Sequence, residues 1–143
     1  MKIAIGADHA GFVLKAQIIE HLRANTTHTW HDFGTYSEAS MDYPDVAHPT
    51  AEAVAEQGFD SGILICGSAN GVAITANKHA NIRAALCWNE EVATLAREHN
   101  NANIICIPAR FVSTQVALSM VDIFIKTSFL GGRHAERISK INC

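Results

Sequence analysis

The sequence predicts an α/β domain in which a five-stranded parallel sheet is covered by helices on both faces. The first observation is a set of five short runs that are interpreted as buried strands, at residues 3–7, 28–33, 62–66, 83–87 and 103–107. Most of them are continuously apolar rather than alternating, which is typical of strands buried on both faces. The second observation is that helical patterns fill the segments between these runs, as in doubly wound domains. We therefore expect one domain over residues 1–143.

The first two helices are predicted from apolar spacing and from the residues that end them. Apolar residues recur with helical spacing between Phe12 and Leu22. A second helix is expected over residues 46–57, with Pro49 in its first turn and Gly58 as its stop. The longest irregular segment, residues 35–45, lies just before this second helix. Long loops in compact domains are often functional.

The other helices follow the third, fourth and fifth strands. A third helix is expected over residues 71–79, after a glycine-rich turn. A fourth is expected over residues 89–99, with Asn89 as its N-cap and Glu90 and Glu91 in its first turn. Residues 113–126 predict a fifth helix, and a short basic helix over about 133–141 ends the chain.

Composition and charge exclude several classes of protein. Eleven Lys and Arg residues against 14 Asp and Glu residues give a net charge of −3, which argues against a nucleic-acid binder driven by bulk charge. Hydrophobic residues make up 48% of the chain, enough for a real core. Charged residues make up only 17%, against about 25% in an average soluble chain. A surface so lightly charged is expected to be covered in part by another subunit.

The apolar runs and the cysteines bear on the compartment. Every run is far shorter than the roughly 20 apolar residues of a membrane-spanning helix, so we expect no membrane segment. Asp8 and His9 interrupt the first apolar run, which argues against a signal peptide. The four cysteines form no CxxC pair and no zinc or disulfide pattern. The simplest compartment is a reducing cytoplasm.

Chemistry-bearing residues follow several of the predicted strands. Because ligands of open parallel sheets bind outside the carboxyl ends of the strands, that edge is the expected site. The first strand leads to Asp8 and His9, the third to Cys66 and the glycine-rich turn, and the fifth to Arg110. We also expect the fourth helix to bring His99 and Asn100 to this edge. A thiol, two imidazoles, a carboxylate and a guanidinium would then converge.

Cys66 has two interpretations, and so does the basic end of the chain. Cys66 begins a turn that leads into a helix, where backbone N–H groups can hold an anion and lower the pKa of a thiol. Cys87 and Cys106 are interpreted instead as small core residues.

Arg133 and Arg137, in the basic segment near the end of the chain, lie four residues apart and would share one face of a helix. They are either part of a solvated tail or a pair that binds a phosphate.

Common cofactor and metal motifs are absent from the sequence. The segment after Gly6 is not a P-loop, because Phe12 and Val13 occupy the positions of the required Lys and Ser or Thr. No GxGxxG or HExxH motif occurs. We therefore expect neither a cofactor nor a dedicated metal site.

Six short motifs, taken in order along the chain, resemble the type B ribose-5-phosphate isomerases, a group that also holds the galactose-6-phosphate isomerase subunits. The motifs are residues 6–12 (GADHAGF), 42–44 (DYP), 65–68 (ICGS), 76–78 (ANK), 97–100 (REHN) and 131–137 (GGRHAER). The resemblance implies a three-layer, Rossmann-like α/β/α sandwich. It also implies a cofactor-free, metal-free enzyme that interconverts ribose 5-phosphate and ribulose 5-phosphate through an enediolate. Such enzymes are homodimers or homotetramers with active sites shared between subunits.

The resemblance also implies a role for each matching residue. Cys66 would be the base, and Ser68 with His99 would assist ring opening. The enediolate oxygen would be held by the backbone at Gly67, Ala69, Asn70 and Gly71, and sugar hydroxyls by Asp8, Tyr43 and Asn100. The phosphate would be bound by His9, Arg110, Arg133 and Arg137. The neighbouring subunit would supply His99, Asn100 and Arg110.

The chain departs from the family pattern at a few positions. The loop commonly reads CGTGIG, but here it is CGSANG, so Ala69 stands where glycine would take a positive φ freely. This change is expected to reshape the loop slightly. Another branch uses a glutamate base where this chain has Val72, which places the chain in the cysteine branch. Asn101 replaces a common aspartate and removes one negative charge.

Three other functions stay open at this point. The nearest is the same chemistry on a hexose 6-phosphate, either allose 6-phosphate or galactose 6-phosphate, since pocket depth is not readable from sequence. The second is a non-catalytic module that binds phosphosugars, against which the presence of Cys66 argues. The third is a redox protein built on Cys66, against which the absence of a partner cysteine argues.

Overall fold

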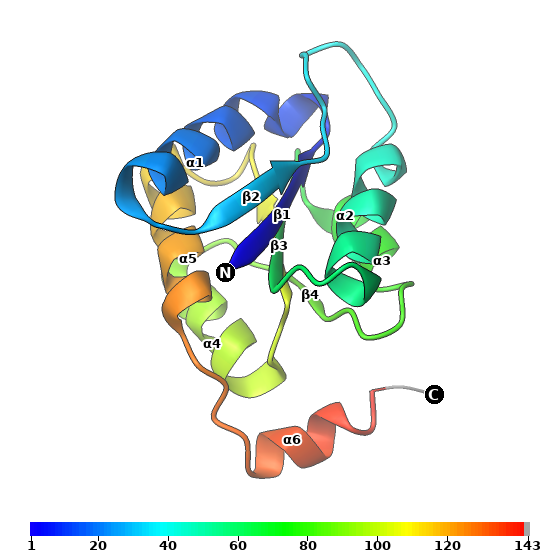
Figure 1. Ribbon diagram of the computed structural model, residues 1–143, viewed down its shortest axis with the longest axis vertical. Coiled ribbons are helices and arrows are strands. Elements are labelled where there is room, and N and C mark those ends of the chain that lie inside the picture. Colours follow the sequence, from blue (N-terminus) through cyan, green and yellow to red (C-terminus); the bar gives the residue numbers. More distant parts are fainter. Residues whose placement is uncertain (142–143) are drawn as a thin grey trace.

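A computed structural model describes residues 1–141 and contains a five-stranded sheet whose neighbouring strands are all parallel. The order across the sheet is β2-β1-β3-β5-β4 (Figure 1). The strands are β1 (Lys2–Ala7), β2 (Thr29–Asp32), β3 (Ser61–Cys66), β4 (Ala84–Leu86) and β5 (Ile104–Pro108). All five predicted strands are therefore present, within one or two residues of their expected bounds.

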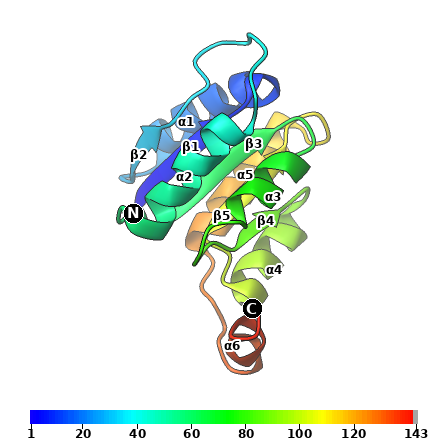
Figure 2. The ribbon, with the colours of Figure 1, turned by 90° about the vertical axis from the view of Figure 1, so that its right-hand side faces the viewer.

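Helices cover both faces of this sheet, as Figure 2 shows. The helices are η1 (His9–Gly11), α1 (Phe12–Asn25), α2 (Pro44–Glu56), α3 (Asn70–Ala76), α4 (Glu90–Asn100), α5 (Thr114–Lys126) and α6 (Arg133–Ile138). Helices α1, α4 and α5 contribute to one buried cluster, and α2 and α3 contribute to the other. The fold is the predicted three-layer α/β/α sandwich, with α6 set apart beyond the end of α4 (Figures 1 and 2).

The two apolar clusters explain why the strands are continuously apolar. Ile5 and Ile63 face the layer of α1, α4 and α5, whereas Leu64 and Ile104 face α2 and α3. These four side chains are at most 1% exposed. Each such burial contributes about 1.5–3 kcal/mol. The central strands are therefore apolar at nearly every position, whichever face the side chain points to.

Several helix ends follow the predicted capping chemistry. The side chain of Asn89 accepts the backbone N–H of Val92 at 2.8 Å, and that of Ser113 accepts the N–H of Val116 at 3.2 Å. Gly58 follows α2 with a φ of +74°. The side-chain caps remove unsatisfied N–H groups at the starts of α4 and α5, and Gly58 accommodates the left-handed turn after α2.

Three helix bounds differ from expectation. Helix α2 begins at Pro44, whose fixed φ suits the first helical position. Pro49 consequently lies inside the helix and not in its first turn, so the prediction for Pro49 was wrong. Helix α3 ends at Ala76 instead of at residue 79, and the basic helix ends at Ile138 instead of at residue 141. Across residues 1–141, no helix combines the length and the hydropathy needed to cross a membrane.

Candidate active site

Cys66 and Asp8 lie side by side at the carboxyl edge of the sheet. Strands β1 and β3 pair with Ala7 opposite Ile65, so the residues that follow these positions are neighbours. The Cys66 thiol donates a hydrogen bond to Oδ2 of Asp8 at 3.1 Å. The other oxygen, Oδ1, accepts the backbone N–H groups of Ala10 at 3.0 Å and Gly11 at 3.1 Å. The carboxylate is thus fixed on one side by backbone and presents its other oxygen to sulfur.

The surroundings of Cys66 raise the pKa of its thiol above the ordinary value. Burial contributes most, followed by the hydrogen bond to Asp8 and the negative charge of that carboxylate. The backbone N–H groups of Ala69 and Ser68 act in the opposite direction but contribute less. The turn therefore acts on this pKa in the expected direction, but burial of the thiol, together with Asp8, outweighs it and the net shift is upward.

We expect Asp8→Asn to lower the pKa of Cys66. Asparagine carries no charge, so the thiolate loses its repulsive neighbour, and the thiol loses its strongest hydrogen-bond acceptor. The measurement is the pH dependence of Cys66 alkylation by iodoacetamide, resolved by peptide mass spectrometry. Cys87, whose burial raises its pKa to about 12, serves as an internal reference that should not respond. An alkylation midpoint that stays in place or rises would contradict this prediction.

The turn after Cys66 has the shape of a glycine loop although it contains alanine. Ala69 is buried and adopts a φ of +62°, in the left-handed region. This conformation is about 1–2 kcal/mol less favourable than the right-handed one for a residue with a Cβ atom. The turn therefore keeps a left-handed conformation at Ala69 in spite of this strain. Beside it, the hydroxyl oxygen of Ser68 accepts the N–H of Asn70 at 3.4 Å.

Tyr43 covers the start of α3. A Cβ atom added at Gly71 would lie 2.5 Å from the Tyr43 ring, so glycine is needed for this close approach. Tyr43 precedes α2 at the end of the long loop, and its side chain is 40% exposed. The loop thereby brings an aromatic ring with a free edge to the turn that follows Cys66.

His9 and Arg110 lie at the same edge of the sheet. Nδ1 of His9 accepts the backbone N–H of Met41 at 3.3 Å, which ties the long loop to η1. Guanidinium atoms of Arg110 lie 3.3 Å from the position of a Cβ on Gly67, and the Arg110 backbone N–H donates to the Gly67 carbonyl at 3.1 Å. The resemblance implied an Arg110 supplied by a neighbour, but here Arg110 stands beside the turn of its own chain.

His99 and Asn100 do not lie at this edge. Helix α4 starts where β4 ends and finishes where β5 begins, so it carries its last residues back to the amino edge of the sheet. In Figure 1 the end of α4 and all of α6 lie at the opposite end of the molecule from the loop that follows β2. The expectation that His99 converges with Cys66 within one chain is therefore wrong.

The end of α4 and helix α6 form a second group of predicted residues, which we call the basic end. The His99 ring stacks on His134, with 4.1 Å between ring centroids and 9° between ring planes. A hollow of about 360 Å³ is lined by His99, Asn100, His134, Arg137, Ile138 and Ile141. Arg133 begins α6, directly before His134. The structure thus divides the predicted site into two halves at opposite edges of one chain.

His134 and Arg97 of the basic end occur in the family motifs, but the sequence alone assigned them no role. Burial lowers the pKa of His134, with smaller contributions from His99, Arg133 and Arg137. Arg97 donates to the Thr127 carbonyl at 3.2 Å and to the Asn101 side chain at 3.2 Å. Arg97 therefore joins the last turn of α4 to the segment that leads to α6. The REHN and GGRHAER motifs were the available signals for both residues.

A dedicated metal centre finds no support in the part of the chain that the structure describes. Residues 1–141 contain no group of three or more His, Cys, Asp and Glu side chains placed to hold a metal ion. His48 and His79 form a hydrogen-bonded pair at 2.7 Å, but this pair lacks a third ligand of these kinds.

Comparison with known proteins covers nearly the whole chain. Residues 3–141 match the family model described as Ribose/Galactose Isomerase. Ribose-5-phosphate isomerase B of Escherichia coli K12 is 42% identical over 140 residues, which are 98% of this chain and 93% of that protein.

Solved structures give the same result. The ribose-5-phosphate isomerase B of Clostridium thermocellum is 47% identical, with a TM-score of 0.96 over 99% of this chain and 95% of that one. The Mycoplasma genitalium enzyme, solved with bound ribulose-5-phosphate, is 44% identical, with a TM-score of 0.93 over 98% and 93% of the two chains. With a family model matched from residue 3 to residue 141 and relatives alike from end to end, this chain belongs to the ribose/galactose isomerase family.

Proposed function

We propose that this protein is a sugar-phosphate isomerase that interconverts ribose 5-phosphate and ribulose 5-phosphate. The observation that carries the proposal is the buried Cys66 thiol, hydrogen-bonded to Asp8 at the carboxyl edge of the sheet. A thiol that donates to a carboxylate at the edge where ligands of parallel sheets bind is a candidate proton carrier, although it also packs in the apolar cluster of α2 and α3. The similarity to an enzyme solved with ribulose-5-phosphate supports the choice of substrate.

The chemistry we assign to Cys66 is proton transfer between two carbons. Sulfur takes the proton from C2 of the open-chain aldose, the electron pair of that bond forms the C1–C2 double bond of the enediolate, and the electrons of the C1 carbonyl move onto O1. The proton of the C2 hydroxyl then passes to O1, and sulfur returns its proton to C1, so that C2 becomes the carbonyl carbon of the ketose. Asp8 accepts the hydrogen bond of the resting thiol, so its Oδ2 is the nearest place for the thiol proton as sulfur becomes a base.

The turn after Cys66 would stabilise the charge that develops. The backbone N–H groups of Ser68 and Ala69 already face the sulfur and favour its anion. We assign the enediolate oxygen to the backbone at Gly67, Ala69, Asn70 and Gly71, and ring opening to Ser68 with His99. Tyr43, beside Gly71, and Asp8 would position sugar hydroxyls.

The complete site requires a second copy of the chain in this proposal. His9 and Arg110 at the Cys66 edge would bind the phosphate together with Arg133 and Arg137 of a neighbouring subunit. That neighbour would also supply His99 and Asn100, which lie at the opposite edge within their own chain. We therefore propose a homodimer or homotetramer, acting in the cytoplasm in the pentose phosphate pathway.

The experiment that tests this function is ketose formation by the purified protein from ribose 5-phosphate, allose 6-phosphate and galactose 6-phosphate, with a chelator present. We expect the pentose phosphate to be turned over with the highest kcat/KM, and we expect the chelator to have no effect. Faster turnover of a hexose phosphate would assign the protein to that substrate. Activity that the chelator abolishes and added metal restores would contradict the metal-free mechanism.

The same experiment addresses a non-catalytic role. If no sugar phosphate is turned over although one of them binds in calorimetry, the protein is a binding module. If a second, different chain restores turnover, the protein is one subunit of a mixed enzyme.

A further inference from the structure

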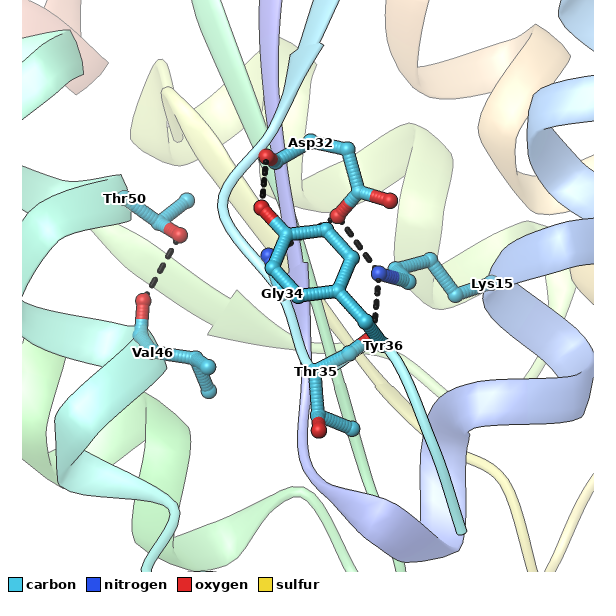
Figure 3. A network of polar contacts seen from close by, with 7 residues as sticks. All are labelled: Lys15, Asp32, Gly34, Thr35, Tyr36, Val46 and Thr50. Atoms are coloured by element: carbon cyan, nitrogen blue, oxygen red, sulfur yellow. Dashed lines mark hydrogen bonds and ion pairs between the residues drawn. The ribbon is translucent and has the colours of Figure 1, made fainter.

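Lys15 is a charged residue in the interior of the fold, and sequence reasoning gave it no role. Its side chain is only 2% exposed, although it lies on α1 among apolar positions. A buried ammonium group is costly unless it is paired and hydrogen-bonded. The Lys15 ammonium meets this condition through two contacts. It lies 2.5 Å from Oδ1 of Asp32 and donates to the carbonyl of Thr35 at 2.7 Å (Figure 3).

The Asp32 carboxylate joins Lys15 to the start of the long loop. The same Oδ1 atom accepts the backbone N–H of Gly34 at 2.9 Å. The hydroxyl of Tyr36 donates to the Asp32 carbonyl at 2.9 Å, and its ring lies 5.1 Å from the Lys15 ammonium. Figure 3 shows these groups gathered around the Lys15 nitrogen. The charge of Lys15 thus holds the backbone of residues 34 and 35 in one place.

That piece of backbone in turn holds the residue before Asp8. Ala7 donates its N–H to the Gly34 carbonyl at 2.7 Å and accepts the N–H of Thr35 at 2.6 Å. Asp8 itself donates its N–H to the Ile65 carbonyl at 3.1 Å. The backbone at Asp8 is therefore set between β3 on one side and the Lys15-anchored loop on the other.

The far end of the same loop reaches the site as well. Its residues Met41 and Tyr43 contact His9 and approach Gly71, as described above. A loop held at its first residues presents these later residues over a smaller range of positions. The contacts of Lys15 therefore support both the Asp8–Cys66 hydrogen bond and the position of the loop that borders it.

We propose that Lys15, acting through Asp32, is a positioning residue that aligns Asp8 with the Cys66 thiol and anchors the loop over the site. The part that concerns turnover rests on the isomerase function proposed above. The part that concerns the alignment of Asp8 does not, because the Cys66 thiol can be examined without substrate.

Lys15→Met and Asp32→Asn test this proposal with two readouts. Methionine keeps most of the side-chain volume without the charge. Asparagine keeps an oxygen that can accept the Gly34 N–H, so Asp32→Asn keeps the test available if Lys15→Met fails to fold. We expect kcat to fall by about tenfold or more, because a small displacement of a reactive group away from its working position strongly reduces the rate of reaction. We also expect the alkylation midpoint of Cys66 to move to lower pH as Asp8 withdraws.

The second readout needs the groups that face Cys66 to be considered together. They are Asp8 from the end of β1, Cys106 from β5 and Arg110, which lies beside Gly67 after β5. Cys106 and Arg110 contact neither Lys15 nor Asp32 among the hydrogen bonds and ion pairs of residues 1–141. Loss of the Lys15 charge would by itself raise the midpoint, so a fall of the Cys66 midpoint in the Lys15 variant reports a displaced Asp8.

Asp122→Asn is the matched control. Asp122 lies on α5, and its Oδ1 lies 3.0 Å from Nε2 of His21. His21 lies on α1, the helix that also carries Lys15. This variant should lose stability in urea without a change in kcat or in the Cys66 midpoint. The double variant Lys15→Met, Asp32→Asn should be no worse than the poorer single variant, since the two residues act as a unit.

The proposal is overturned if folded Lys15→Met or Asp32→Asn loses stability alone, with kcat and the Cys66 midpoint as in the native protein. Lys15 would then be a structural ion pair and nothing more. If the native protein proves to have no isomerase activity, the proposed function fails, but the Cys66 midpoint still decides whether Lys15 positions Asp8.

Discussion

Cys66→Ala should abolish isomerisation and leave the binding of a phosphosugar analogue nearly unchanged. In the proposed mechanism the substitution removes the group that would carry the proton between the two carbons. Asp8 contacts that group through a hydrogen bond, and it is not expected to take over the proton transfer. Loss of a general base costs about 10²–10⁴-fold in rate. We expect kcat to fall by at least about 10³-fold, because in the proposed mechanism Cys66 would act as base in one half-reaction and as acid in the other. The measurement is ketose formation alongside calorimetry with a pentonate phosphate.

A matched control separates catalysis from packing. Cys106 lies on the neighbouring strand β5, is completely buried and belongs to the same apolar cluster as Cys66. Cys106→Ala should lower the free energy of unfolding by about 1 kcal/mol through loss of packing, with kcat as in the native protein. Turnover retained in Cys66→Ala would remove this residue from the role of base. Turnover lost equally in both variants would point to packing instead of chemistry.

Much of the fold could be predicted because each element has a local cause. Central strands need apolar residues on both faces, so runs such as residues 62–66 stand out from the sequence. The start of α4 could be placed at Asn89 because its side chain caps the helix. The start of α2 was missed because two prolines, Pro44 and Pro49, offer the same signal for a first turn, and only one of them takes it.

The site was harder to predict because its geometry depends on distant residues. The contact between Cys66 and Asp8 joins residues 58 positions apart, yet strand ends at one sheet edge made it foreseeable. The burial of Lys15 was not foreseeable in this way. A lysine within an amphipathic helix normally faces water, and its partner Asp32 lies on a strand that looks half-exposed. The pairing becomes evident only when the loop after β2 is placed against Ala7.

The position of His99 was mispredicted for a reason that the topology explains. Helices that connect parallel strands begin at the carboxyl edge and return to the amino edge. Residues at the end of α4 consequently lie away from a site at the carboxyl edge of their own chain. If the residues of REHN and ICGS belong to one site, as the proposed function requires, they lie at opposite edges of a chain and would have to come from two chains.

Mixing two inactive variants should restore activity if the site is shared in this way. Cys66→Ala removes a residue of one half of the site, and His99→Ala removes a residue of the other half. In a mixed dimer, one site carries both substitutions, whereas the other combines an intact Cys66 with an intact His99. Random exchange yields mixed dimers in about half of the population, so about a quarter of native activity should return.

The restored activity identifies which chain supplies each half. Each variant is first assayed alone, where both should be nearly inactive, and the two are then unfolded together in urea, refolded and assayed again. Mixing Cys66→Ala with Asp8→Ala is the control, because Asp8 and Cys66 lie in contact within one chain and each mixed dimer has one damaged residue in every site. That mixture should stay inactive. If Cys66→Ala and His99→Ala likewise stay inactive after refolding, both halves belong to one chain, and α6 would have to move from its place beyond α4 to complete the site. Recovery would mean instead that the separation of the two halves within a chain is the geometry that makes the subunits depend on one another.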